Sequence, residues 1–312
     1  MSDLQYTKGE VETFVRRWTE AGFGQIEEQL TKLVLAAVEF DLEASRDEAI
    51  DVGETKLGGR PDLRDPTLWP RTKDGRAIGF AAQINLKQMA EFRLGSDLPR
   101  DGLLSFFVDV EEYNDFMEER VHHCLSGKHE EADQWRVLYE SDPTSLARAE
   151  FPADLSGKAR CGVAAVVPQR ILTMPDPDEP SIERLGIRET DDEHWTFFEL
   201  CDERDPRGRP RFYGNAAPIQ RGMKLWCQYA THGVVNFAND PRIPDLNDPR
   251  MPDINAGIDD WLHLFTLDAC NDHLAACQGM EFVGDSAIYF LIRKQDLARQ
   301  DFEKAWLTLQ IG

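Results

Sequence analysis

Residues 79–85, GFAAQIN, lead to residues 101–107, DGLLSFF, and the same pattern returns as LHLFTLD at 262–268 and GDSAIYF at 284–290. In the first copy 19 positions separate Gln83 from Gly102, and in the second the same 19 separate Thr266 from Asp285. Each copy is typical of an apolar strand, a polar connection, a turn and a second strand that ends in paired aromatics. The sequence therefore predicts a β-rich α+β fold with two pseudo-repeated antiparallel β units.

The remaining segments arrange themselves around these two units. We predict a single compact domain whose pseudo-repeats cover about 33–110 and 210–312. Apolar residues at three- and four-residue steps between Val11 and Phe23 indicate an N-terminal helical cap within residues 1–32. Residues 111–209 are interpreted as a central insertion with a strand at 135–140, strands within 162–174 and helices near 181–185 and 195–201.

Charge restricts the partners of this protein. The 312 residues include 35 Lys and Arg against 57 Asp and Glu, a formal net charge of −22. Such a charge repels nucleic-acid phosphates and anionic lipid surfaces, so we expect neither nucleic acid nor membrane as a partner. The N-terminal residues lack the pattern of a signal peptide, and no apolar run approaches the ~20 residues of a membrane helix, so we expect a cytoplasmic protein.

The negative charge is concentrated in two blocks. Residues 109–119 hold six acidic side chains and no basic one, and residues 176–205 hold twelve acidic and three basic ones. Such blocks speed the capture of a basic protein, although a plain solubilising surface has the same composition. The predicted partner-binding residues are Asp109, Glu111, Glu112, Asp115, Glu118, Glu119, Asp191, Asp192 and Glu193.

Candidate catalytic and metal sites find little support. Cys270, His273 and Cys277 have a spacing that could place three ligands on one side of a helix, but a fourth ligand is needed, and buried thiols are the simpler interpretation. No phosphate-binding glycine motif and no nucleophile elbow occurs. We therefore predict no catalytic residue, no metal and no cofactor.

A glycine-rich loop offers one candidate ligand site. Lys56 and Arg60 flank Gly58 and Gly59, a pattern that could hold a small anion or a partner chain, although the glycines could equally serve only to shape a packed loop. The candidate ligand residues are Lys56, Gly58, Gly59, Arg60, Gln83, Gln220 and Asp285.

A series of short motifs runs along the chain: KLGGRPDL at 56–63, LWP at 68–70, AQINL at 82–86 and LPRDGLLSFF at 98–107, and near the C-terminus Gly284-Asp285, Tyr289-Phe290, Asp296-Leu297 and Asp301-Phe302. Together these motifs resemble those of the YwqG-like family, a bacterial family of unknown function. Residues 214–220, GNAAPIQ, keep the Pro-x-Gln end of a family segment but lack its Gly-Tyr-Pro lead. Because members occur beside secreted toxins, the resemblance implies an immunity protein.

Two classes of function follow from these observations. The first is a non-enzymatic protein that neutralises a basic, nuclease-like bacterial toxin through its acidic surface. The second is an enzyme or small-ligand binder that uses a cleft between the two repeats. A flat acidic face favours the first class, and a pocket with convergent polar groups favours the second.

Overall fold

One large antiparallel sheet dominates the computed structural model, which describes residues 7–95, 97–109, 133–188, 192–204, 208–220, 222–232, 249–268, 274, 276–277 and 286–311. The strands are β1 (Leu35–Ala44), β2 (Lys56–Gly58), β3 (Asp62–Leu63), β4 (Gly79–Asn85), β5 (Leu103–Val108), β6 (Trp135–Glu140), β7 (Ala147–Arg148), β8 (Val163–Thr173), β9 (Arg211–Phe212), β10 (Trp261–Asp268), β11 (Ser286–Arg293) and β12 (Trp306–Ile311). The helices are α1 (Lys8–Trp18), α2 (Glu27–Leu33), α3 (Leu86–Ala90), α5 (Pro180–Glu183), α6 (Asp192–Arg204), α7 (Met223–Thr231), α8 (Met251–Ala256) and α9 (Lys294–Ala298).

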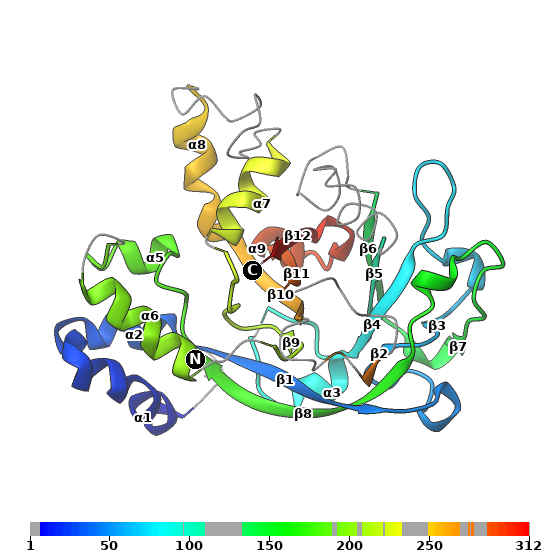
Figure 1. Ribbon diagram of the computed structural model, residues 1–312, viewed down its shortest axis with the longest axis horizontal. Coiled ribbons are helices and arrows are strands. Elements are labelled where there is room, and N and C mark those ends of the chain that lie inside the picture. The colour runs from blue at the N-terminus through cyan, green and yellow to red at the C-terminus, as the bar shows by residue number, and fades with distance from the viewer. Residues whose placement is uncertain are drawn as a thin grey trace.

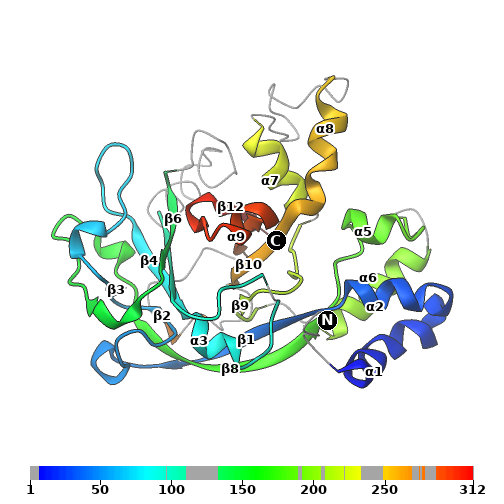
Figure 2. The same cartoon turned by 180° about the vertical axis from the view of Figure 1, so that it is seen from behind.

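The two longest strands form the centre of the sheet. β1 pairs with β8 along its whole length, from Leu35 opposite Thr173 to Ala44 opposite Ala164. The order β12-β11-β10-β9-β1-β8-β2-β4-β5-β6 places the hairpin of β4 and β5 on one side of this pair and the hairpin of β10 and β11 on the other. Figure 1 shows β1 and β8 across the base and the two sets of strands rising from it, and Figure 2 shows the same curve from behind.

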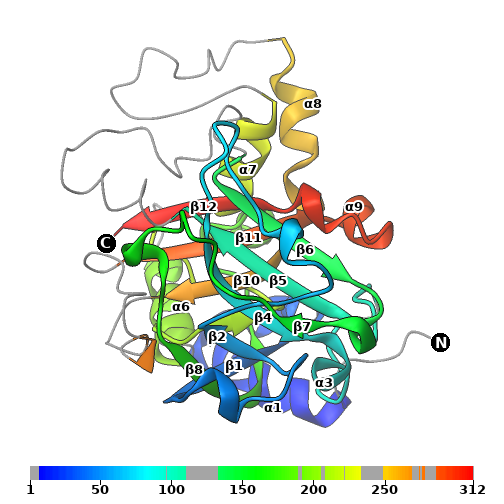
Figure 3. The ribbon, with the colours of Figure 1, turned by 90° about the vertical axis from the view of Figure 1, so that its right-hand side faces the viewer.

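The curvature brings the two edges of the sheet close together, so that the sheet is nearly closed. The indole Nε1 of Trp135, at the start of β6, donates to the carbonyl oxygen of Ala305, just before β12, at 3.0 Å. The rings of Trp135 and Trp306 meet edge-on with centroids 5.0 Å apart. In the side view of Figure 3, β12 runs past the upper part of the β4, β5 and β6 layer.

Aromatic side chains fill the space between the two hairpins. Phe106 of β5 contacts Phe265 of β10 and Phe290 of β11, with ring centroids 4.7 and 5.0 Å apart. All three rings are fully buried. Residues of both hairpins are buried on both faces, which explains why their sequences read as continuous apolar runs.

A second core lies between the N-terminal helices and α6. α1 begins with a capping box, in which Thr7 Oγ1 accepts from the amide of Glu10 and the Glu10 carboxylate accepts from the amide of Thr7. Trp18 and Phe23 pack against Phe197 of α6, with centroids 6.0 and 5.4 Å apart. Among the described residues, no helix is both long and apolar enough to cross a bilayer.

The structure confirms the predicted β-rich α+β class and the N-terminal helices. The internal repeat stays a prediction. Residues 111–209, interpreted from the sequence as an insertion, contribute β6 to one edge of the sheet and β8 to its centre.

Candidate functional site

The glycine-rich loop is held by buried ion pairs. The side chain of Lys56 is fully buried in β2, and its Nζ lies 2.8 Å from Asp47 Oδ1 and donates also to the carbonyl of Arg60. Burial lowers the pKa of Lys56, and the carboxylates of Asp47 and Asp62 offset part of that effect. The pKa of Asp47 is low although burial acts to raise it, because Lys56 and Arg60 donate to its carboxylate.

The other loop residues are also occupied by partners within the chain. Arg60 forms ion pairs with Asp47 and with two exposed carboxylates, those of Glu48 and Glu150. Gly58 has a φ of +62°, and a Cβ there would lie 2.0 Å from the carbonyl oxygen of Gly162. The interpretation that this loop is shaped for packing therefore accounts for Lys56, Gly58, Gly59 and Arg60 without a ligand.

Gln83 completes the same buried network. Its Nε2 donates to Asp62 Oδ2 at 2.6 Å and to the carbonyl of Glu54 at 2.7 Å, and its Oε1 accepts from the amide of Asp62 at 3.0 Å. Arg148 donates to the other carboxylate oxygen of Asp62. The fully buried Gln83 therefore ties β3 and the loop before β2 to β4.

The second-half members of the predicted ligand site lie elsewhere. Gln220 is exposed, and its backbone N–H donates to Gln310 Oε1 at 2.9 Å. It takes no part in the buried network of Lys56, Arg60 and Gln83. Asp285 lies outside the described residues. The structure thus brings Lys56, Gly58, Gly59, Arg60 and Gln83 together but does not bring Gln220 to them.

The first acidic block has one described member. Asp109 is 1% exposed and forms an ion pair with the guanidinium of Arg76, with Oδ1 2.8 Å from Nη1. A carboxylate that is buried and paired in this way cannot contact a partner, so Asp109 does not belong to an acidic surface. The remaining predicted residues of this block, Glu111, Glu112, Asp115, Glu118 and Glu119, lie outside the described residues.

The second acidic block contains an exposed aromatic pair. Trp195 and Phe198 on α6 are 53% and 39% exposed, and their ring centroids are 6.2 Å apart. The other large apolar side chains exposed in the described part of the chain, Val52, Leu68 and Val167, are aliphatic and come from separate segments. Sequence reasoning missed this pair.

Exposed carboxylates surround the aromatic pair. Asp192, Glu199 and Asp202 are exposed and lie three or four residues from Trp195 or Phe198, so helix geometry places all five on one side of α6. We call these five residues the α6 face. Glu193, a predicted partner-binding residue, is exposed at the start of α6 but lies two residues before Trp195, so helix geometry places it on another side of the helix, and Asp191 lies outside the described residues.

The opposite side of α6 fixes the orientation of this face. His194 and Phe197 are buried, and His194 Nε2 lies 3.4 Å from Asp178 Oδ1 in the acidic turn before α5. Cys201 donates to the carbonyl of Pro175 in the same turn. The α6 face is therefore a surface on a helix anchored along its inner side.

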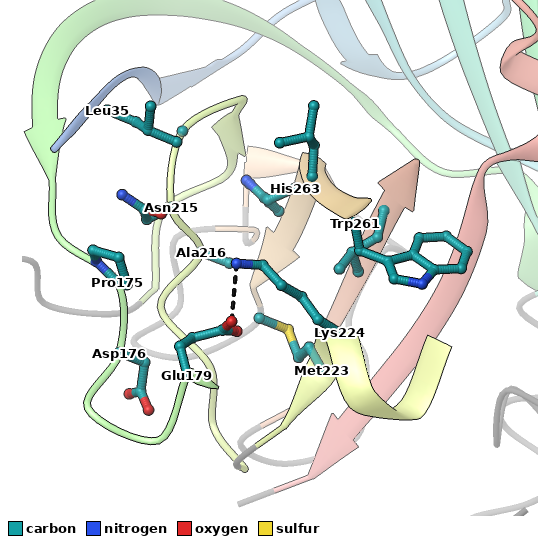
Figure 4. A pocket seen from close by; sticks show the side chains of 13 residues that line it. Leu35, Pro175, Asp176, Glu179, Asn215, Ala216, Met223, Lys224, Trp261 and His263 are labelled. Atoms are coloured by element: carbon teal, nitrogen blue, oxygen red, sulfur yellow. Dashed lines mark ion pairs between the residues drawn. The ribbon is translucent and has the colours of Figure 1, made fainter. Parts of the chain in front are cut away.

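A small cavity adjoins this acidic turn. Glu179 and Lys224 face each other across it, with Oε2 and Nζ 2.9 Å apart and both side chains largely buried (Figure 4). Its volume is about 30 Å³, room for little more than one water molecule. This cavity is too small for a substrate, so its residues serve the packing of the turn against α7.

His263 lines the same cavity and is held in one neutral form (Figure 4). Its Nδ1 lies 3.2 Å from the carbonyl of Tyr213, which can only accept, so Nδ1 carries the proton. The bare Nε2 then accepts from the hydroxyl of Thr266 at 2.5 Å. Burial, with a smaller contribution from the charge of Arg211, lowers the pKa of His263 to about 3.

No metal site can be assembled from the described residues. Cys277 is buried, burial raises the pKa of its thiol to about 12, and its Sγ lies 3.8 Å from the carbonyl of Leu57. Cys270 and His273 lie outside the described residues. The part of the chain that the structure describes holds no group of three or more His, Cys, Asp or Glu side chains suited to a metal ion.

Comparison with known proteins assigns a family. A family described as a domain of unknown function, DUF1963, matches residues 55–311. The match covers most of the chain, so the protein belongs to this family. No curated protein matches the chain significantly.

Proposed function

We propose that this DUF1963 protein is a non-enzymatic protein that binds a basic protein partner through the α6 face. The exposed Trp195–Phe198 pair within an acidic helix is the observation that carries the proposal. Tryptophan, tyrosine and arginine dominate the binding energy of protein interfaces, and exposed apolar side chains that adjoin one another mark interaction surfaces where scattered single ones do not.

The chemistry of the face determines the kind of partner. A lysine or arginine side chain can lie on the ring of Trp195 while its charge meets the carboxylates of Asp192 and Glu199. The net charge of −22 attracts such a partner over longer distances and raises the association rate at low salt. Trp18 and Phe23 pack against the inner side of α6, so the helix is already ordered before a partner arrives. Binding therefore costs little conformational entropy in this protein.

An immunity role is the biological setting that we propose for this interaction. The phosphate-binding groove of a nuclease toxin is basic, so an acidic face with two aromatic anchors has the complementary charge. This setting rests on the family resemblance and on the acidic surface.

Site-specific photo-cross-linking tests the proposal. A photoreactive phenylalanine analogue replaces Trp195 in one variant and Leu68, which is also 53% exposed but lies in the turn between β3 and β4, in a matched control. We expect irradiation of producing cells to yield an adduct with a basic protein from position 195 and none from position 68. The same adducts from both positions, or none from position 195, would contradict the proposal.

We also propose that the two halves of the sheet arose by duplication. The ladder of β4 with β5 is irregular between Phe80 and Ala82, and that of β10 with β11 between His263 and Phe265, at positions that differ by the same 183 residues as Gln83 and Thr266. β2 and β9 occupy matching places in the strand order. Experimental coordinates in which 79–108 and 261–293 do not superpose with these bulges matched would refute the duplication.

A further inference from the structure

A second pocket opens where the two edges of the sheet approach each other. It has a volume of about 270 Å³, slightly below the ~300–1,000 Å³ of pockets for drug-sized ligands, so it fits a smaller molecule. Nine residues from the ends of β6, α7, β10, β11 and β12, from α9 and from the segment between α9 and β12 line it: Trp135, Thr231, Trp261, Arg293, Asp296, Glu303, Lys304, Ala305 and Trp306. It is separate from the α6 face.

Three largely buried indoles supply the apolar part of the lining, and polar groups supply the larger part of its accessible surface. Trp135, Trp261 and Trp306 are each less than 10% exposed. The indole N–H of Trp135 donates to the carbonyl of Ala305, and that of Trp261 donates to Gln228 Oε1 at 2.9 Å. Because both N–H groups are used within the protein, these two indoles offer a ligand only their apolar surfaces, which favours a ligand with an aromatic or large apolar body.

Arg293 brings a positive charge that no carboxylate of the described residues neutralises. Its guanidinium stacks on Trp261, 4.8 Å from the ring centroid, and Nη2 donates to Thr231 Oγ1 at 2.7 Å and, at 3.5 Å, to Gln228 Oε1. Both acceptors are neutral, and they use only one of the guanidinium nitrogens. A half-buried arginine with unused donors is suited to a carboxylate ligand.

Asp296 brings the opposite charge to the same pocket. It lies three residues after Arg293, is only partly exposed, and its carboxylate forms no ion pair within the described residues. Glu303 and Lys304 are exposed and add one charge of each sign. The pocket thus has a net charge near zero but holds a separate cation and anion, which matches a zwitterion better than a simple anion.

We propose that this pocket binds a free α-amino acid with an aromatic or large apolar side chain. Arg293 takes the carboxylate, Asp296 takes the ammonium group, and the indoles of Trp135, Trp261 and Trp306 enclose the side chain. This inference does not rest on partner binding by the α6 face, and it gives the protein a small-molecule ligand in addition to a protein partner.

Calorimetric titration of the full chain with three related probes tests the proposal. Tryptophan carries both charged groups, tryptamine lacks the carboxylate, and indole-3-propionate lacks the ammonium group. We expect tryptophan to bind at least tenfold more tightly than either analogue, because each analogue loses one charge-assisted contact. Failure of all three probes to release or absorb heat on binding would overturn the proposal.

Two variants assign each charge to its residue. Arg293→Gln is expected to weaken tryptophan at least tenfold and to leave tryptamine unchanged, and Asp296→Asn is expected to weaken tryptophan and leave indole-3-propionate unchanged. Val167→Ala, at an exposed position of β8, is the matched control and should keep parent affinities. If Arg293→Gln weakens the binding of tryptamine as much as that of tryptophan, the assignment of the carboxylate to Arg293 is wrong. Should either variant fail to fold, the analogue series on the parent protein still tests the pocket.

Discussion

Acid should destabilise this protein through His263 in particular. The ordinary pKa of histidine is 6.5, and burial lowers that of His263 to about 3 in the folded chain. Above pH 6.5 the imidazole is neutral in both the folded and unfolded states and contributes no pH dependence. Between pH 6.5 and about 3 the unfolded chain binds a proton that the folded chain does not, so the free energy of unfolding decreases as the pH falls.

The size of the effect follows from the width of that window. Each pH unit within it removes up to about 1.4 kcal/mol, so a fall from pH 6.5 to about 4.5 removes about 3 kcal/mol. A domain is typically stable by about 5–15 kcal/mol, so one histidine removes a substantial fraction. The neighbouring positive charge of Arg211 acts in the same direction as burial.

Urea denaturation at several pH values between 7 and 4.5 measures this contribution. The variant His263→Gln keeps a donor and an acceptor but cannot take up a proton in the window, so its free energy of unfolding should fall less steeply with acid than that of the parent. His232→Gln removes an exposed histidine without touching the buried site and is the matched control. Parallel pH profiles for the parent and His263→Gln would refute the reasoning, whatever their offset.

Two further predictions concern the packed loop. Lys56→Met should destabilise the protein by about 3 kcal/mol in urea denaturation, because it leaves the largely buried carboxylate of Asp47 without its closest cation, and an unchanged midpoint would contradict the buried network. Gly58→Ala should lower the melting temperature far more than Gly75→Ala, since both positions have positive φ but only at Gly58 would the new Cβ meet backbone, the carbonyl of Gly162. If calorimetry gave equal decreases in melting temperature for the two variants, the positive φ alone, and not the contact with Gly162, would explain the destabilisation.

The local sequence pattern predicted where strands and helices occur better than it predicted which strands pair with one another. The strand expected at 135–140 is observed as β6 with the same limits, because alternating apolar residues and aromatics report a half-buried strand directly. The pairing of β1 with both β8 and β9 joins residues more than a hundred positions apart, and no local pattern encodes it. The strands expected within 162–174 form one strand, β8, which continues through Pro168, because β2 pairs only with residues 163–165 and the edge opposite β1 is unpaired at Pro168.

Charge in the sequence identified the acidic segment that contains the candidate site, but the sequence analysis did not predict its exposed aromatic pair. Composition identified residues 176–205 as an acidic block, but the exposure of Trp195 depends on which side of α6 meets Trp18 and Phe23, which lie more than 170 residues earlier. A helical projection of 192–202 offered a signal, since acidic and aromatic residues at steps of three and four share one side. Lys56 shows the opposite case: the sequence left open whether this cation beside two glycines holds a ligand or belongs to a packed loop, and its carboxylate partner is Asp47 of the same chain.

Binding kinetics with the partner cross-linked at position 195 show directly whether the α6 face binds that partner. We compare the parent with Trp195→Ala/Phe198→Ala and with Asp192→Asn/Glu199→Gln at low and high salt. We expect the aromatic variant to bind the partner at least tenfold more weakly because it dissociates faster. We expect the acidic variant to associate with the partner more slowly, mainly at low salt. Parent-like rates for both variants at both salt concentrations would contradict the claim that the α6 face binds the partner.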